Sequence, residues 1–138
     1  MNKYQELNNK QQEEFNKFPC FFAFSQEQFK EGMVSLGLNP SDTDKIYRSA
    51  GSMFYKKSDS ALLKEMTDKF EKEINSAIEN DKTGEGFIKD MFDYELANHE
   101  YGYTRSLDQT LEALDLTLED IEKNKKLKHG LELALKKY

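Results

Sequence analysis

The chain of 138 residues is polar and acidic: 37% of its residues are hydrophobic, 33% are charged, and 26 acidic residues against 20 basic ones leave a net charge of −6. This length predicts one domain, residues 1–138, that buries roughly two-thirds of the surface of its unfolded chain. No apolar run is long enough for a membrane span, the N-terminus lacks a signal-peptide pattern, and the single Cys20 cannot form an internal disulfide, so we expect a cytoplasmic protein.

The charge is distributed unevenly along the chain. The segment from Glu122 to the end has six lysines and two glutamates, so residues 1–121 carry a net charge of −10. An acidic body disfavours direct nucleic-acid binding, which depends on neutralising phosphates. It favours a protein partner with a basic surface, whose approach it would steer. The simpler alternative is that the acidity only confers solubility.

Two segments open the chain. Residues 2–17 carry a narrow apolar stripe and predict a helix that Pro19 ends. The apolar, aromatic run at 20–24, bounded by proline and serine, predicts a buried strand.

A second helix and a hairpin follow. Ser25, with Gln28 three residues later, makes a capping-box pattern and predicts a helix through about Leu36. In residues 45–57, apolar and polar positions alternate weakly on either side of a Ser-Ala-Gly-Ser interruption. This pattern predicts a hairpin that turns near Ala50–Gly51. Together with the first strand, the hairpin gives a small antiparallel sheet of two or three strands.

The rest of the chain is predicted to be helical. Residues 59–79 carry a continuous apolar stripe, and residues 84–99 form the next helix, with Thr83 as its N-cap. Short helices begin after Ser106 and after Thr117, and residues 125–137 form the last one. The fold class is therefore α+β: a mainly helical single domain with one small sheet.

The loop before the 84–99 helix begins like a calcium-binding EF-hand loop. Asp81, Thr83 and Glu85 supply oxygens at its first, third and fifth positions, and Gly86 stands at the sixth. The twelfth position is Phe92, so the bidentate carboxylate is missing. The pattern therefore favours a capped turn.

A carboxylate and an imidazole lie one turn apart on the 84–99 helix. Glu95 and His99 continue the apolar face of this helix, spaced so that both can meet one metal ion or each other. Cys20 and His129 are the other candidates for a zinc ligand set. Alternatively, Glu95 and His99 satisfy each other at the rim of the core. A small metal-dependent hydrolase would further need a general base, for which Glu100 is the nearby spare carboxylate.

Two surfaces are candidates for binding a protein. Tyr101 and Tyr103 flank Gly102, and tyrosine is enriched at interfaces because its ring buries area while its hydroxyl stays satisfiable. The same two side chains could instead cover the core. The other surface is the acidic face of the 59–79 helix, whose candidate residues are Glu65, Asp68, Glu71 and Glu73. The lysine cluster at 123–128 is typical of a solvated face rather than of a nucleic-acid site.

Several runs resemble a family of small proteins encoded by phages and prophages of Gram-positive bacteria. They are Pro19–Ser25, Glu27–Phe29, Gly84–Phe87 and, most specifically, Tyr94–Thr104. The resemblance covers most of the chain and carries no enzymatic activity, so it implies a phage accessory role without chemistry. Small acidic phage proteins of this kind include anti-CRISPR inhibitors of type II-A Cas9, at least one of which looks like a zinc protein.

The leading hypothesis is therefore an anti-CRISPR protein, a monomer or small homo-oligomer that binds Cas9 and sterically blocks DNA loading. A structural zinc held by some of Cys20, Glu95, His99 and His129 is a secondary hypothesis. The first alternative is a phage accessory protein that binds another host factor. The second is the metal-dependent hydrolase around Glu95 and His99.

Overall fold

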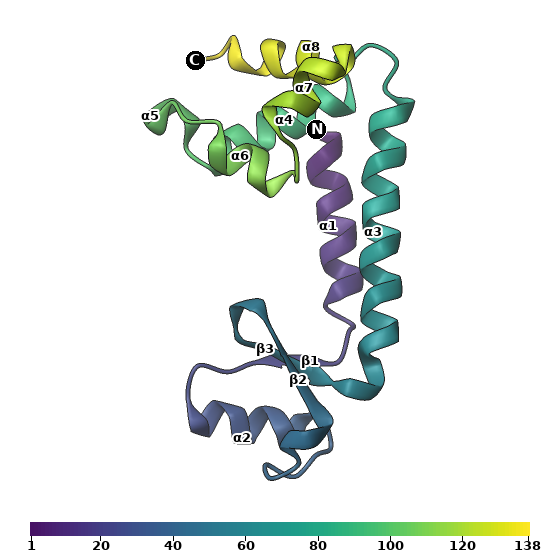
Figure 1. Cartoon of the computed structure of the whole chain (residues 1–138), viewed down its shortest axis with the longest axis vertical. Coiled ribbons are helices and arrows are strands. Elements are labelled where there is room, and N and C mark those ends of the chain that lie inside the picture. Colours follow the sequence, from purple (N-terminus) through teal and green to yellow (C-terminus); the bar gives the residue numbers. More distant parts are fainter. The chain divides into compact units, whose positions relative to one another are not determined.

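The computed structural model describes residues 1–138, and its contacts divide them into two compact units. Unit 1 contains residues Met1–Gln11 and Glu71–Tyr138, and unit 2 contains Gln12–Phe70. The first and third helices therefore contribute residues to both units. Figure 1 labels the elements in chain order.

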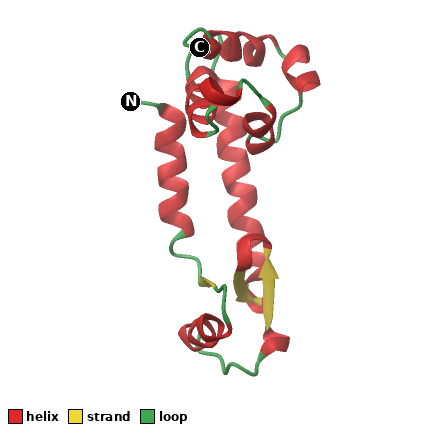
Figure 2. Cartoon of the chain, turned by 90° about the vertical axis from the view of Figure 1, so that its left-hand side faces the viewer, coloured by secondary structure: helices red, strands yellow, loops and turns green.

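The predicted fold class is confirmed: the chain is mainly helical with a small three-stranded antiparallel sheet, and all three strands belong to unit 2 (Figure 2). The helices are α1 (Lys3–Phe15), α2 (Gln26–Ser35), α3 (Ser60–Asn80), α4 (Phe87–Asn98), α5 (Tyr101–Thr104), α6 (Asp108–Ala113), α7 (Leu118–Lys123) and α8 (Lys125–Leu135). The strands are β1 (Cys20–Phe22), β2 (Ile46–Ser49) and β3 (Met53–Lys56). No helix combines the length and the apolar character that a membrane crossing requires.

Unit 2 is organised around its sheet, in the order β1-β3-β2. The hairpin turns at Ala50–Ser52, where Gly51 has a φ of 73°, as the sequence predicts. One face of the sheet packs on α2 through an aromatic cluster in which the Phe21 and Phe54 rings stack at 5.2 Å and Phe29 meets both edge-on. Met33 of α2 is fully buried in this core.

The predicted ends of α2 are confirmed. The Ser25 hydroxyl accepts a hydrogen bond from the Gln28 backbone N–H at 3.2 Å. The Gln28 side chain reaches one residue further back than a standard capping box, because its oxygen accepts from the Phe24 N–H at 2.7 Å. Gly37 follows the helix with a φ of 76°, the left-handed conformation common at this position.

Unit 1 is built around α4, which is the central helix that the sequence predicts. Ile88, Phe92 and Leu96 are fully buried in a core to which α1, α6, α7 and α8 also contribute. Helix α8 approaches α4 closely at Gly130, where a Cβ atom would lie 2.5 Å from Ile88 Cγ2 and 2.7 Å from the Gly84 carbonyl oxygen. Glycine is therefore required at this contact.

Helix α4 begins later than predicted, at Phe87, and Thr83 does not cap it. The capping group is the carboxylate of Asp81, whose Oδ2 accepts hydrogen bonds from the N–H groups of Gly86 and Ile88 at 3.1 and 3.0 Å. Its Oδ1 accepts from Thr83 and Gly84 at 3.3 and 2.9 Å. The capped turn is thus present, with the cap supplied from further upstream.

Three other details differ from prediction. The strand β1 ends at Phe22, and Phe24 is 77% exposed. None of the residues of α3 is fully buried, and Leu62 on its stripe is 50% exposed, because only the part with Ile74, Ala77 and Ile78 packs on the unit 1 core. The loop expected after His99 contains one helical turn, α5.

Candidate interaction site

The Glu95 and His99 side chains satisfy each other. Glu95 is 6% exposed, its Oε2 lies 3.2 Å from His99 Nε2, and its Oε1 accepts from the Tyr4 hydroxyl at 3.3 Å. Burial raises the pKa of Tyr4 to about 12; a hydrogen bond with Asn8 opposes this rise, and the nearby Glu95 charge adds to it. Both carboxylate oxygens are occupied, which favours a structural role for the pair.

The four candidate zinc ligands are not brought together as a set. His129 lies 3.7 Å from Glu85, and Cys20 belongs to unit 2, where burial raises the pKa of its thiol. No group of three or more His, Cys, Asp or Glu side chains is placed to hold a metal ion. The geometry therefore offers Glu95 and His99 only as a pair, and a structural zinc stays a prediction.

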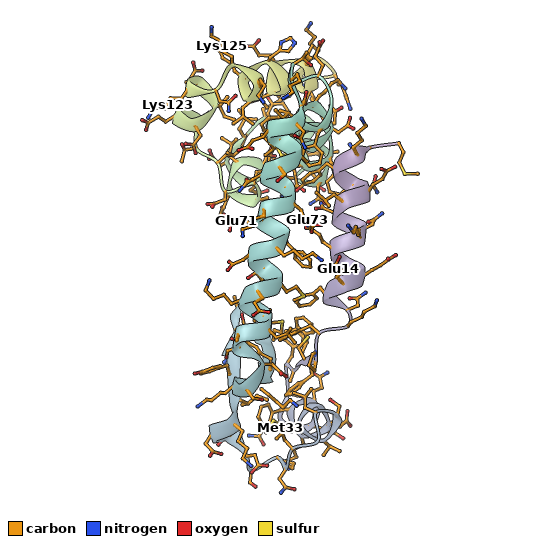
Figure 3. All side chains as sticks on the ribbon, turned by 90° about the vertical axis from the view of Figure 1, so that its right-hand side faces the viewer. Glu14, Met33, Glu71, Glu73, Lys123 and Lys125 are labelled. Carbon is orange, nitrogen blue, oxygen red and sulfur yellow. The ribbon has the colours of Figure 1, made fainter.

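The four candidate carboxylates of α3 have different surroundings. Asp68 forms an ion pair with Lys64 at 2.8 Å in unit 2. Glu73 faces α1, where its oxygens lie 3.3 Å from the Gln11 amide nitrogen and 3.5 Å from Lys10 Nζ. Figure 3 shows Glu71 and Glu73 on different sides of the α3 ribbon. Glu73 therefore packs against α1, whereas the exposed Glu71 can contact a partner.

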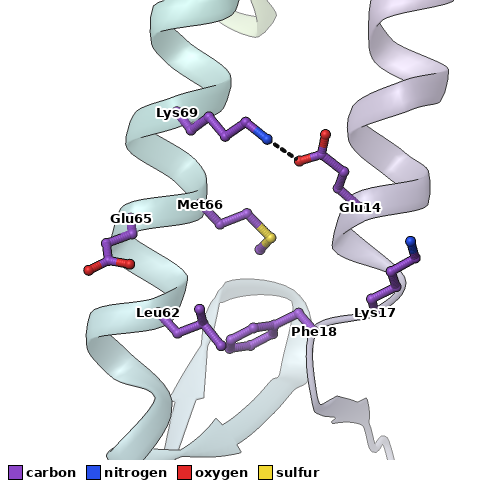
Figure 4. A pocket seen from close by; sticks show the side chains of 7 residues that line it. All are labelled: Glu14, Lys17, Phe18, Leu62, Glu65, Met66 and Lys69. Carbon is purple, nitrogen blue, oxygen red and sulfur yellow. Dashed lines mark hydrogen bonds and ion pairs between the residues drawn. The ribbon is translucent and has the colours of Figure 1, made fainter.

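The fourth carboxylate, Glu65, lines a pocket of about 350 Å³ in unit 2. The apolar wall of this pocket is formed by Phe18, Leu62 and Met66 (Figure 4). The charges in its lining sum to zero. Glu14 and Lys69 form an ion pair at 2.8 Å, and the other two charged lining residues, Lys17 and Glu65, have opposite signs. This pocket has no electrostatic preference for a basic partner.

A more enclosed groove of about 420 Å³ lies in unit 1 and has two acidic residues in its lining. They are Glu71, from α3, and Asp115, from the turn after α6. The other lining residues are mostly apolar: Tyr4, Ile74, Ile78, Met91, Ala113, Leu114 and Leu116, with Asn75. This combination suits a partner segment with an apolar side chain next to a basic one.

Asp115 takes a backbone conformation that is costly for a residue with a side chain. Its φ is 54°, at the position after α6 where glycine is usual. The turn is closed by the Leu116 N–H, which donates to the Leu111 carbonyl at 2.9 Å. The sequence thus keeps an acidic residue in the lining of the groove where glycine would be less strained.

Tyr101 and Tyr103, the two tyrosines proposed to bind a partner, lie beside a second opening in unit 1. They line a pocket of about 530 Å³ together with Leu96, Ala97, Glu100, Gly102 and Tyr138. Tyr103 is 93% exposed, whereas Tyr101 packs edge-on against Tyr138 with ring centroids 5.1 Å apart. The alternative that these residues cover the core therefore applies to Tyr101 and not to Tyr103.

The side chains of the lysine cluster at 123–128, which extends into α8, mostly make contacts within unit 1. Lys126 donates to the carbonyls of Ile78 and Glu79 at the end of α3, at 3.3 Å each. Lys123 and Lys128 pair with glutamates, and Figure 3 shows Lys123 and Lys125 on the outside of the molecule. These contacts agree with a solvated, structural cluster.

The net negative charge belongs to one part of the chain. Residues 71–121 contain 14 acidic and four basic side chains, a net charge of −10, whereas residues 1–70 contain ten of each. The groove and the tyrosine pocket are both formed mainly by this acidic segment. It is the part of the chain whose electrostatics best fit a basic partner.

Sequence reasoning missed Asp115 and Tyr138. Asp115 lies in a short turn between helices, where an acidic residue is unremarkable, and only its positive φ and its place on the groove distinguish it. Tyr138 is brought to Tyr101 by the packing of α8 and has no local signal.

A family of unknown function, DUF7659, matches residues 3–137, nearly the whole chain. The chain belongs to this family. No curated protein and no solved structure matches it. The description of this family names no activity.

Proposed function

We propose that this protein works by binding a protein partner with a basic surface through the acidic part of unit 1. The observation that carries the proposal is the groove lined by Glu71 and Asp115 together with apolar side chains, because it joins apolar area to negative charge. Buried apolar area supplies affinity, while the −10 charge of residues 71–121 steers the encounter and selects against acidic partners.

The resemblance to phage and prophage proteins supports type II-A Cas9 as that partner. Cas9 holds its guide–target heteroduplex in a positively charged channel, which is the kind of surface that an acidic protein would occupy. Inhibition would then be steric, by blocking DNA loading in the cytoplasm of a bacterial host, and it needs no chemistry. Another host factor with a basic surface is the alternative partner.

The deciding experiment is target-DNA cleavage by Cas9 ribonucleoprotein, titrated with this protein and with the order of addition varied. We expect inhibition that saturates near one protein per Cas9 and disappears when DNA is loaded first. No inhibition across several type II-A Cas9 orthologues would contradict Cas9 as the partner.

A matched pair of variants tests the groove itself. Glu71→Gln with Asp115→Asn removes two charges at the groove and keeps the side-chain shapes, whereas Glu27→Gln with Glu31→Gln removes two exposed charges from α2. We expect the groove variant to bind the partner roughly three- to tenfold more weakly, with a smaller dependence on salt, and the α2 variant to bind normally. Equal binding by both variants would exclude the groove as the contact.

If Cas9 is not the partner, the same pair of variants serves as bait with lysate from a bacterial host. A protein captured by the wild type and the α2 variant, and lost with the groove variant, supports the alternative host factor. Capture that does not distinguish the two variants contradicts the proposed site.

A further inference from the structure

The pocket beside α5 has an unusual lining for its size. Three of its seven residues are tyrosines, and its only charged residue is Glu100. The Tyr101 and Tyr138 rings stand nearly perpendicular, at 78°, and Tyr103 projects into solvent at the opening. The pocket lining therefore combines aromatic rings in more than one orientation with one acidic residue.

The backbone holds these side chains in place by an unusual turn. Glu100 and Arg105, on either side of α5, both have left-handed backbone angles, with φ values of 54° and 57°. The turn is closed by the N–H groups of Tyr103 and Arg105, which donate to the carbonyls of Glu100 and Tyr101 at 2.9 and 2.8 Å. Two such residues around a single turn are costly, and such strain is concentrated at functional sites.

Gly102 lets the turn approach the end of the chain. A Cβ atom at this position would lie 3.2 Å from Cε1 of Tyr138, tighter than an ordinary van der Waals contact. The absence of a side chain at Gly102 thus lets the Tyr138 ring pack against this turn and form part of the pocket lining.

The chemistry of this lining favours a cation. Aromatic ring faces carry negative electrostatic potential and attract ammonium and guanidinium groups, and the Glu100 carboxylate adds a full charge. A neutral apolar ligand would desolvate Glu100 without a compensating bond. The Arg105 guanidinium already lies 5.8 Å from the centre of the Tyr101 ring, so a ring of this pocket stacks with the same group within the chain.

We infer that the tyrosine pocket binds an arginine side chain of the protein partner. A guanidinium is planar, stacks on tyrosine rings and pairs with a carboxylate through two parallel hydrogen bonds, which a lysine ammonium cannot do. The inference rests on the proposed function, since the arginine belongs to the basic partner, and it names the residue that this pocket recognises.

The test titrates the full-length protein with the pentapeptide amide Ala-Ala-Arg-Ala-Ala, acetylated at its N-terminus, and follows backbone amide resonances by NMR. The matched peptide carries citrulline, which has nearly the same shape and no charge. We expect shifts centred on Gly102 and Tyr103 with the arginine peptide, and binding at least about fivefold weaker with the citrulline peptide. A lysine peptide should bind at an intermediate strength.

Variants of exposed Tyr103 separate stacking on a cation from ordinary apolar contact. Tyr103→Phe keeps the ring face and should retain binding, whereas Tyr103→Leu keeps bulk without the ring and should lose roughly threefold or more. Glu100→Gln should weaken binding of the arginine peptide and leave the citrulline peptide unchanged. Tyr47→Leu, at an exposed tyrosine of unit 2, serves as the control.

Equal affinity for the arginine and citrulline peptides, or no effect of Tyr103→Leu, would overturn the inference. Its failure is distinguishable from that of the proposed function. If the partner binds and the peptides do not, the pocket is wrongly assigned while the acidic groove stands. If the arginine peptide binds as expected and Cas9 does not, the pocket stands and the proposed partner is wrong.

Discussion

Replacing Asp81 by alanine should destabilise unit 1, because one carboxylate joins the end of α3 to the start of α4. It accepts four backbone hydrogen bonds, from Thr83, Gly84, Gly86 and Ile88, at 2.9–3.3 Å. Loss of a helix cap costs about 1 kcal/mol, and hydrogen bonds to a charged group contribute about 1.5–3 kcal/mol each when buried. Asp81 is only half-buried and water replaces part of the loss, so we expect a decrease of about 3 kcal/mol in the free energy of unfolding.

The loss of unfolding free energy in Asp81→Ala should be larger at neutral pH than at acidic pH. Burial raises the pKa of the Asp81 carboxyl, but the four backbone donors outweigh burial and hold the pKa below its ordinary value of 3.8. A carboxyl with a lowered pKa in the folded state contributes stability above its unfolded pKa and loses it as the pH falls through its folded pKa. The difference between wild type and Asp81→Ala should therefore be full at pH 7 and shrink below about pH 4.

Urea denaturation followed by circular dichroism at pH 7 and near pH 3 measures both effects. Glu112→Ala is the control, because Glu112 is an exposed carboxylate on α6, and it should change the free energy of unfolding by less than about 0.5 kcal/mol. A loss for Asp81→Ala no larger than that of the control would refute the capping role. A loss that is as large near pH 3 as at pH 7 would refute its electrostatic basis.

The other predictions concern packing, titration and metal. Gly130→Ala should cost about 2 kcal/mol and lower the Tm, because its methyl group would overlap Ile88 and the Gly84 carbonyl; an unchanged Tm would contradict that contact. The phenol of Tyr4, identified by difference from Tyr4→Phe, should titrate near pH 12, so its contribution to stability falls as the pH rises from 10 to 12; ionisation near pH 10 would contradict its burial against Glu95. The zinc hypothesis predicts that a chelator lowers the Tm, and an identical melting curve would exclude it.

Sequence patterns predicted the elements whose causes are local. Thr117 and Asp120 show this most clearly, since the Thr117 hydroxyl accepts from the Asp120 N–H while the Asp120 carboxylate accepts from the Thr117 N–H. The hairpin at Gly51 and the end of α2 at Gly37 are of the same kind, because glycine takes a positive φ at little cost. Each of these features depends on residues within a few positions of one another.

Predictions failed where a distant residue or a tertiary contact decides the structure. Thr83 is the nearest capping residue to α4, but Asp81 reaches the helix from five and seven positions upstream and replaces it. The apolar stripe of α3 is continuous in sequence, yet Leu62 stays half exposed because only the later part of the stripe meets the unit 1 core. Periodicity shows which face of a helix is apolar and does not show how much of it is covered.

The sequence predicted several residues of the candidate site, but it did not predict which of them lie together. The sequence marks Glu71, Tyr101 and Tyr103, but it does not show that Glu71 lines a groove with Asp115 or that Tyr101 packs against Tyr138. Asp115 and Tyr138 both come from the chain after α5, and no local sequence pattern places them in these openings. Unit 1 therefore has two differently lined openings, and residues 71–121 supply most of the lining of both. The groove and pocket variants perturb different openings, so measuring them together against one partner tests whether both openings contribute, with additive losses expected if they act independently.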